Sequence, residues 1–346
     1  MRAKPSGMFV RRALSIFAAM LAGIAALSAT EALRIGRAAE ADLLQLESKI
    51  RLGQVAGRID HMAIDLTRQR LFVAELGNDS VGVVDLKERR LIRRIAGLRE
   101  PQGVGYVQTA DALYVANARD GSVLVFRDAD YSPAGRIDLG DDADNIRVDS
   151  TADQVFVGYG NGALAVIDPA KRRKITDIAL KGHPESFQLD RSSSRIFANV
   201  PDAQAIAVVD RAAGRQTASW PTTNAGGNFP MALDEDAQQV IVVFRNPAKL
   251  GVFSMRDGSV AGSAETCGDS DDVFVDTKRH RVYVSCGDGF LDVFDTQAGA
   301  YKRIAHVSTV SGARTSLFVP QLDRLLLAVR ASPGEPAAIW VYRPAP

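Results

Sequence analysis

Acidic side chains crowd one short stretch, "LGDDADNIRVD", in which Asp141, Asp142, Asp144 and Asp149 surround Asn145. Carboxylate and amide oxygens are the ligands that hard cations such as calcium prefer. The stretch lacks the glycine and the final glutamate of an EF-hand loop, so it does not form a complete cation site alone. Further ligands would have to come from other parts of the chain, which the fold must bring together.

A short β-rich core recurs seven times along the chain. The cores "LFVA", "LYVA", "VFVG", "IFAN", "VIVV", "VYVS" and "LLLA" begin at Leu71, Leu113, Val155, Ile196, Val240, Val282 and Leu325. Successive cores start about 42 residues apart, and each lies between a preceding strand such as "HMAID" and a following one such as "VGVVD". A weaker fourth strand ends each unit. Four antiparallel strands at this period are typical of a propeller blade, so we predict an all-β, seven-bladed β-propeller.

The two ends of the chain supply one blade between them. The seventh unit stops at its third strand, "AIWVYRP", whereas "ESKIRLGQVAG" near the N-terminus resembles the fourth strands of the other units. An N-terminal strand would pair the otherwise open edge and close the ring. We therefore predict a single propeller domain over residues 47–344, and place Asp149 at the far end of its strand, away from the other three aspartates.

The N-terminus carries an export signal. Arg11 and Arg12 precede the apolar run Ala13–Ala29, and small residues follow it. This pattern is typical of a secretory signal peptide, so residues 1–38 are interpreted as signal and linker, and the location as periplasmic or extracellular. The alternative is an uncleaved N-terminal anchor, which would be the chain's link to a membrane.

The units "LYVANARDGSVLVFR" and "VYVSCGDGFLDVFD" resemble the YVTN-repeat β-propellers, the YncE-like proteins of the bacterial envelope. The resemblance implies an exported seven-bladed propeller. Some relatives have been linked to single-stranded DNA, and similar propellers serve as subunits of quinoprotein dehydrogenases. No catalytic motif of those enzymes maps onto this sequence, so no catalytic residue is assigned from the resemblance.

Aligned units place polar side chains at one end of the propeller axis, in the loop that enters each first strand. We call this end the axial mouth. Its candidate ligand-binding residues are Arg58, Asp60, His61, Glu100, Gln102, Asp142, Asp144, Asn145, His183, Glu185, Asp271, Asp272 and Arg314. A divalent cation is the candidate cofactor, with Asp144, Asp271 and His61 as its ligands. The alternative is that Asp and Asn simply suit tight turns beside a wet channel.

Two function classes follow for the axial mouth. The favoured one is a non-enzymatic, monomeric protein that binds a small ligand, a cation or a partner protein there. The alternative is an enzyme, either a lactonase-like hydrolase or a metal- or quinoprotein-type oxidoreductase subunit. The sequence contains neither a G-x-S-x-G elbow nor a P-loop.

The turns on the opposite face of the propeller are rich in basic residues, although the net charge of the chain is only +1. These residues are Arg68, Arg70, Lys87, Arg89, Arg90, Lys171, Arg172, Arg173, Lys174, Lys278, Arg279 and Arg281. Such a face could bind single-stranded nucleic acid through its phosphates. Aromatic side chains that would stack on bases are sparse among these turns, which argues against this function.

The two cysteines, Cys267 and Cys286, fall in the same unit. An exported protein enters an oxidising compartment, where disulfides persist. Simple strand pairing would place Cys286 opposite Asp271, so Cys267 would have to fold back to reach it. A disulfide and a pair of buried free thiols both remain open at this point.

Overall fold

The computed structural model describes residues 43–346, and the interpretation of residues 1–38 as signal and linker lies outside this range. Within it, strands dominate, and three short 3-10 turns interrupt them at Leu76–Asn78, Pro201–Ala203 and Gln297–Gly299. No helix in this part of the chain is long and apolar enough to cross a membrane.

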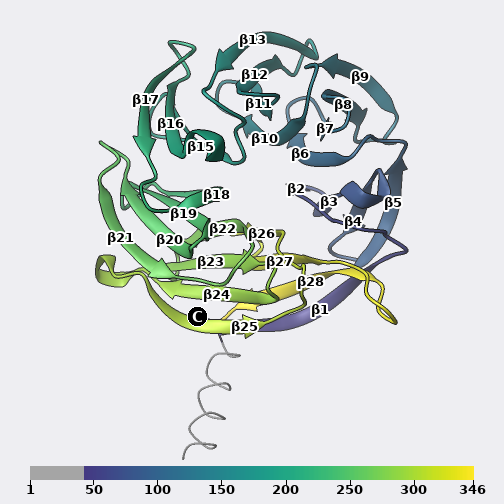
Figure 1. Ribbon diagram of the computed structural model, residues 1–346. Helices are drawn as coiled ribbons and strands as arrows, with labels where there is room; N and C mark the ends of the chain where they lie inside the picture. Colours follow the sequence, from purple (N-terminus) through teal and green to yellow (C-terminus); the bar gives the residue numbers. More distant parts are fainter. Residues whose placement is uncertain (1–42) are drawn as a thin grey trace, which may run out of the picture.

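Seven sheets of four antiparallel strands form a ring, which confirms the predicted seven-bladed β-propeller (Figure 1). Blade 1 holds β2 (Met62–Asp65), β3 (Arg70–Glu75), β4 (Ser80–Asp85) and β5 (Arg90–Ala96). Blade 2 holds β6 (Pro101–Val107), β7 (Ala112–Asn117), β8 (Ser122–Arg127) and β9 (Pro133–Asp138). Blade 3 holds β10 (Ala143–Asp149), β11 (Gln154–Tyr159), β12 (Ala163–Asp168) and β13 (Arg173–Ala179). Blade 4 holds β14 (Phe187–Leu189), β15 (Arg195–Val200), β16 (Ala205–Asp210) and β17 (Arg215–Pro221).

The remaining three blades continue the same order. Blade 5 holds β18 (Gly226–Asp234), β19 (Gln239–Asn246), β20 (Ala248–Ser254) and β21 (Val260–Glu265). Blade 6 holds β22 (Ser270–Asp276), β23 (Arg281–Cys286), β24 (Phe290–Asp295) and β25 (Lys302–Ser308). Blade 7 holds β26 (Ser316–Val319), β27 (Arg324–Val329), β28 (Ala337–Pro344) and β1 (Leu44–Gly53). The first strand of each blade lies toward the centre of the ring and the fourth lies outside (Figure 1).

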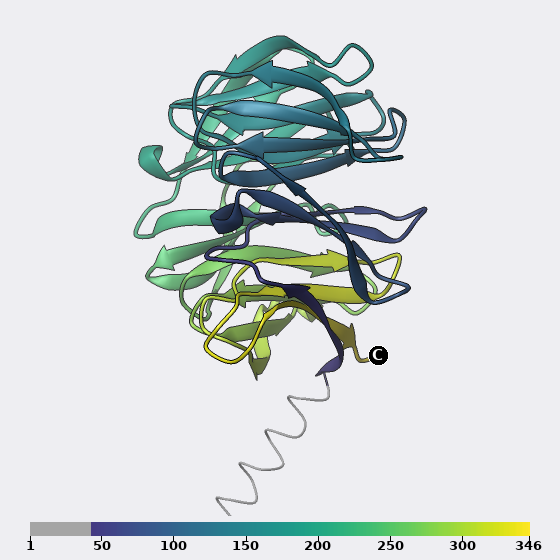
Figure 2. The same cartoon turned by 90° about the vertical axis from the view of Figure 1, so that its right-hand side faces the viewer.

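The N-terminal strand closes the ring, as predicted. β1 pairs antiparallel with β28, and the register places Leu44 opposite Pro344 and Ile50 opposite Ile339. The two strands lie side by side at the outer edge of blade 7 (Figures 1 and 2). The observed strand starts at Leu44, slightly earlier than the sequence pattern indicated. This pairing satisfies an edge that would otherwise be open to other chains.

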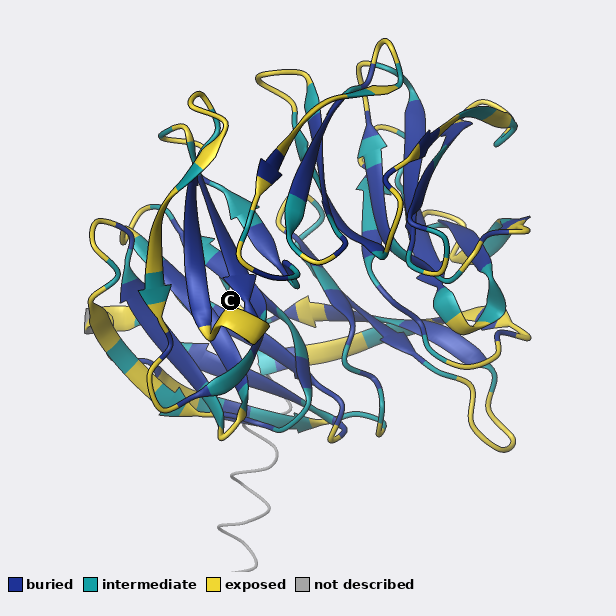
Figure 3. Ribbon diagram, turned by 45° about the horizontal axis from the view of Figure 1, so that its top comes forward, coloured by how far each residue is buried: buried dark blue, intermediate teal, exposed yellow. Residues whose placement is uncertain are grey.

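The core lies between neighbouring blades and is built by the second and third strands (Figure 3). In β3, Leu71, Phe72, Val73 and Ala74 are all fully buried. Such strands are apolar on both faces, because a blade packs against a neighbour on each side. The fourth strands, such as β13, are mostly exposed. The buried strands therefore hold the first strands around the axis.

Aspartates at the ends of the first strands serve the turns on the opposite face. Asp65 Oδ1 accepts hydrogen bonds from the main-chain nitrogens of Thr67 and Arg68 at 2.9 and 3.2 Å. Asp149 does the same for the turn that follows β10, so it lies away from the mouth, as its place in the repeat predicted. The recurring aspartate at this position is therefore a turn residue.

Candidate functional site

β-Bulges aim consecutive residues of the first strands at the axial mouth. The strand pairing is interrupted between Ala143 and Ile146 in blade 3 and between Ser270 and Asp272 in blade 6. Similar interruptions occur in blades 2 and 5. A bulge adds a residue to one strand and re-aims its side chain. The predicted mouth residues Asp144, Asn145 and Asp271 lie within these bulges.

On the side of blades 5 to 7, the mouth carboxylates are held by arginines. Arg245 lies 2.6 Å from an oxygen of Asp271 and 3.6 Å from one of Asp269. Arg314 lies 2.7 Å from Asp269 and 3.3 Å from Asp271. Phe229 lies under the guanidinium of Arg245, 3.8 Å from ring centroid to Cζ. Two cations thus neutralise two carboxylates, and this side of the mouth is a closed ion-pair network.

Blade 1 contributes a buried aspartate and its partners. Asp60 is fully buried, and Arg58 Nη2 lies 2.5 Å from its Oδ2. His61 lies between two carboxylates, 3.5 Å from Asp60 and 3.9 Å from Asp272. Burial opposes protonation of His61, but the charges of Asp60 and Asp272 outweigh it and raise the pKa of the imidazole. Burial raises the pKa of Asp60 as well.

Blades 3 and 4 bring three carboxyl groups and one histidine together. His183 Nε2 lies 3.7 Å from Asp144 and Nδ1 lies 3.8 Å from Asp142, while Nδ1–H donates to the Gly160 carbonyl at 2.7 Å. Burial works against the charged form, yet Asp144, the Gly160 carbonyl and Asp142 together raise the pKa of His183 to about 9. His183 is therefore protonated at neutral pH and offsets one of the carboxylates.

Glu185 is the carboxyl group of this side that has no partner. Within residues 43–346 its side chain forms neither a hydrogen bond nor an ion pair, although its main-chain oxygen accepts a hydrogen bond from Asn145 Nδ2. Burial and, second, the charge of Asp144 raise the pKa of Glu185 to about 7. Asp144 Oδ1 is also buried without a hydrogen-bond partner. The Asp144–Glu185 side of the mouth is thus the part whose carboxylates are least satisfied.

Three other predicted residues have local roles at the mouth. Asn145 joins blade 3 to blade 4 through its amide, and its Oδ1 accepts from Arg147 at 3.1 Å. Gln102 Nε2 donates to Asp142 Oδ1 at 3.4 Å. Glu100 turns away to Arg119, 2.5 Å distant, where both side chains are exposed. Of the predicted set, Glu100 contributes least to the mouth.

Sequence reasoning did not select two arginines that shape the mouth, Arg245 and Arg330. They occupy the same position of the repeat, at the end of the second strand: Arg245 is the last residue but one of β19, and Arg330 directly follows β27. Arg330 lies among Arg314, Arg58, Asp271 and Asp269, and burial lowers its pKa. Extending the repeat alignment past the second strand would have found them. The mouth carries both signs of charge, with its arginines on blades 1, 5 and 7 and the protonated His183 beside the carboxyl groups of blades 3 and 4.

The proposed cation ligands Asp144, Asp271 and His61 are not gathered around one point. In the part of the chain that the structure describes, no three His, Cys, Asp or Glu side chains are placed to hold a metal ion. Asp271 is instead paired with Arg245 and Arg314, and His61 lies beside Asp60.

The basic turns of the opposite face are paired with acidic side chains in several places. Arg68 forms ion pairs with Asp65, Asp111 and Asp128. Arg279 does so with Asp276 and Asp323, and its side chain is nearly buried. These pairs reduce the number of guanidinium groups on this face that could contact phosphate.

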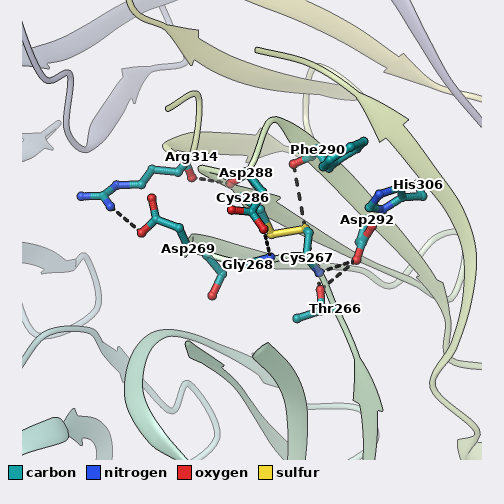
Figure 4. The surroundings of a disulfide bond; sticks show 12 residues. Thr266, Cys267, Gly268, Asp269, Cys286, Asp288, Phe290, Asp292, His306 and Arg314 are labelled. Carbon is teal, nitrogen blue, oxygen red and sulfur yellow. Dashed lines mark hydrogen bonds and ion pairs between the residues drawn. A yellow bond between two sulfur atoms is a disulfide. The ribbon is translucent and has the colours of Figure 1, made fainter. Parts of the chain in front are cut away.

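A disulfide joins Cys267 to Cys286 and anchors the loop that enters blade 6 (Figure 4). Their Cα atoms are 5.8 Å apart, so the loop folds back as a disulfide requires. Buried Asp292 accepts hydrogen bonds from Thr266 Oγ1 and from the main-chain nitrogen of Cys267, at 2.9 and 2.8 Å. Asp269 and Asp271 follow directly, so this cross-link positions the carboxylates that Arg245 and Arg314 bind.

Comparison with known proteins supports the fold alone. The structure is similar to one of hydrazine synthase from Kuenenia stuttgartiensis, with a TM-score of 0.73 and 16% identity over 87% of this chain and 97% of that chain. It is also similar to a chain in a crystal structure of the mitotic checkpoint complex, with a TM-score of 0.72 and 10% identity over 85% of this chain and 91% of that chain. No protein-family model and no curated protein matches the sequence. The chain is a β-propeller scaffold, an architecture that often mediates binding.

Proposed function

We propose that this protein is an exported, non-enzymatic propeller of the YVTN-repeat type that binds an organic cation at its axial mouth. The observation that carries the proposal is the Asp144–Glu185 side of the mouth. There, the Glu185 carboxyl group has no partner within residues 43–346, and an oxygen of Asp144 is buried without a hydrogen bond. A buried carboxylate that lacks a donor is unfavourable, and a bound ammonium or guanidinium group would supply one.

The arrangement favours an organic cation over an anion or a metal ion. Arg245 and Arg314 form their ion pairs with Asp269 and Asp271, and Arg58 forms its own with Asp60, so the charges of Arg245 and Arg58 reach Glu185 only at longer range, without direct contact. His183 supplies one positive charge against three carboxyl groups on this side. A group with several N–H donors matches such a set better than a spherical ion, which needs its ligands around one point. The lysine or arginine of a partner protein offers the same chemistry as a small amine.

Agmatine, which carries both an ammonium and a guanidinium group, tests the binding site. We expect isothermal titration calorimetry to detect binding to the mature protein. Glu185→Gln should weaken it by about 10- to 150-fold, because a hydrogen bond to a charged group contributes roughly 1.5–3 kcal/mol. Asp144→Asn should act in the same direction. Glu88→Gln, an exposed glutamate in a turn of the opposite face, is the matched control and should bind normally. Wild-type protein that ignores agmatine, or equal affinities for all four proteins, would exclude this site.

Export is supported by the basic and apolar N-terminus and by the disulfide, which fits an oxidising compartment. Expression of the full chain in a Gram-negative host tests it. We expect the periplasmic fraction to contain a protein whose mass corresponds to a start between Ala29 and Glu40. Full-length protein that stays in the cytosol would contradict export, and full-length protein in the membrane fraction would indicate the anchor instead.

A further inference from the structure

A cavity of about 620 Å³ occupies the channel behind the axial mouth. All seven first strands line it. At one end lie His61, Asp272 and Ser316, and at the other lie Leu66 and Gln321, which follow the ends of β2 and β26 on the opposite face. Asp144 and Glu185 are not among the lining residues, so this cavity lies behind the cation site proposed above and adjoins it at Ser186.

The walls of the channel combine apolar side chains with strand edges. The partly exposed apolar residues among its lining are Ile64, Val148, Leu233 and Val275, whereas Met62, Met231 and Val273 belong to the cores between blades. Each first strand is the end strand of its sheet, so one of its edges has no neighbouring strand in the blade. A volume of this size is within the range of small-molecule sites, which join apolar walls to a few polar groups.

Arg147 is the cation at the inner part of this cavity. Its Nη1 donates to Asn145 Oδ1 at 3.1 Å and to the Ile146 carbonyl at 2.8 Å, both of which are uncharged acceptors. Phe187 lies beside the guanidinium, with its ring centroid 5.5 Å from Cζ. No carboxylate within residues 43–346 forms an ion pair with Arg147, and burial lowers its pKa although Asp272 and Asp144 are near enough to oppose this. Its charge is therefore incompletely compensated by the protein.

A second cavity, of about 610 Å³, adjoins the first between blades 3 and 4 on the opposite face. The two share Arg147, Val148, Gln188 and Arg191 among their lining residues. The second cavity lies where the first strand of blade 4, β14, has only three residues, against seven in β10. A ligand that enters from the opposite face would pass Arg191 at the rim and reach Arg147 inside.

We infer that the channel is a second binding site, which takes an organic anion with a carboxylate at Arg147 and an apolar body along the channel wall. The planar guanidinium suits a carboxylate because it can donate two parallel hydrogen bonds. The inner end of the cavity also contains Asp272, whose pKa burial raises to about 7, so this carboxyl group is partly neutral at physiological pH. His61 beside it has a raised pKa and adds positive charge.

Octanoate and 1-octanol test the inference, because they share one apolar chain and differ in charge. We expect calorimetry on the mature protein to show that octanoate binds at least tenfold more tightly than 1-octanol. Arg147→Met should weaken octanoate binding about tenfold. Arg256 is an exposed arginine on the opposite face of the propeller, and Arg256→Met should leave octanoate binding unchanged. Equal binding of octanoate and 1-octanol would overturn the inference.

Two further variants keep the test decisive if Arg147→Met does not fold. Val148→Trp fills the cavity at a residue that both cavities share and leaves Arg147 in place, so octanoate affinity should again fall about tenfold. Unchanged affinity in this variant would also overturn the inference. Glu185→Gln should bind octanoate as the wild type does, which separates this site from the mouth.

Discussion

Removal of the Cys267–Cys286 disulfide should lower the free energy of unfolding of the propeller by an amount that follows from the length of the loop it closes. The two cysteines are 19 residues apart in the sequence. Closing a loop of this length removes conformational entropy from the unfolded chain, which corresponds to about 3 kcal/mol at 25 °C. Reduction, or the double substitution Cys267→Ala and Cys286→Ala, should lower the free energy of unfolding by this amount.

The loss of about 3 kcal/mol in the free energy of unfolding also determines the expected change in melting temperature. An entropy of unfolding of about 2.1 cal/mol/K per residue gives about 0.6 kcal/mol/K for roughly 300 folded residues. Dividing about 3 kcal/mol by this entropy gives a decrease of about 5 °C in Tm. Both cysteines are buried, so the double alanine variant also loses some packing, and its decrease should be at least as large as that of the reduced wild type.

Urea unfolding with and without dithiothreitol is the appropriate assay. The wild type should lose stability when the reductant is added, whereas the double alanine variant should be unaffected by it. Thiol titration of the unfolded wild type, without reductant, should detect no free thiol. Two titratable thiols, or an unfolding midpoint that ignores the reductant, would refute this reasoning.

Three further outcomes are expected. Ile50→Ala in β1 should cost about 2–5 kcal/mol in urea unfolding because this side chain is 1% exposed, whereas Leu46→Ala, at 43% exposed in the same strand, should stay within about 0.5 kcal/mol. The pKa of His183 is raised to about 9, so its contribution to stability is complete below about pH 6.5 and disappears as the pH rises through 9. The difference in Tm between the wild type and His183→Gln should therefore shrink between pH 6 and pH 10. The pKa of Glu185 is raised to about 7, so its ionisation disfavours the folded state as the pH rises from about 4.5 through 7. In thermal melts, the Tm of Glu185→Gln should therefore rise relative to that of the wild type across this pH interval.

The architecture could be predicted because each blade repeats the same local signals. The cores at about 42-residue spacing and the polar turns between them identified seven blades, and the unit left incomplete at Pro346 indicated the closing strand. These features depend on hydrophobic pattern and turn chemistry, which neighbouring residues determine. They required no knowledge of how distant side chains meet.

The details of the mouth could be predicted only in part. Aligned units placed Asp144 and Asp271 at one end of the axis, yet the partners of these carboxylates depend on side chains that reach across blades. Arg245 and Arg330 come from the ends of second strands, which the alignment of first strands did not include. Bulges also escaped notice, because an added residue in one strand hardly changes a period of about 42. Long-range contacts of this kind depend on packing, which residue spacing does not describe.

The pairing of β1 with β28 makes closure of the ring depend on the first and the last strand of the propeller together. Blades 1 to 6 are each built from one continuous segment, so each can form as soon as its own strands are available. Blade 7 instead pairs Leu44 with Pro344, and it cannot assemble until the last strand has been made. Contacts so distant in sequence make folding slow. Until β28 has been made, the propeller is therefore an open row of blades whose ring cannot close.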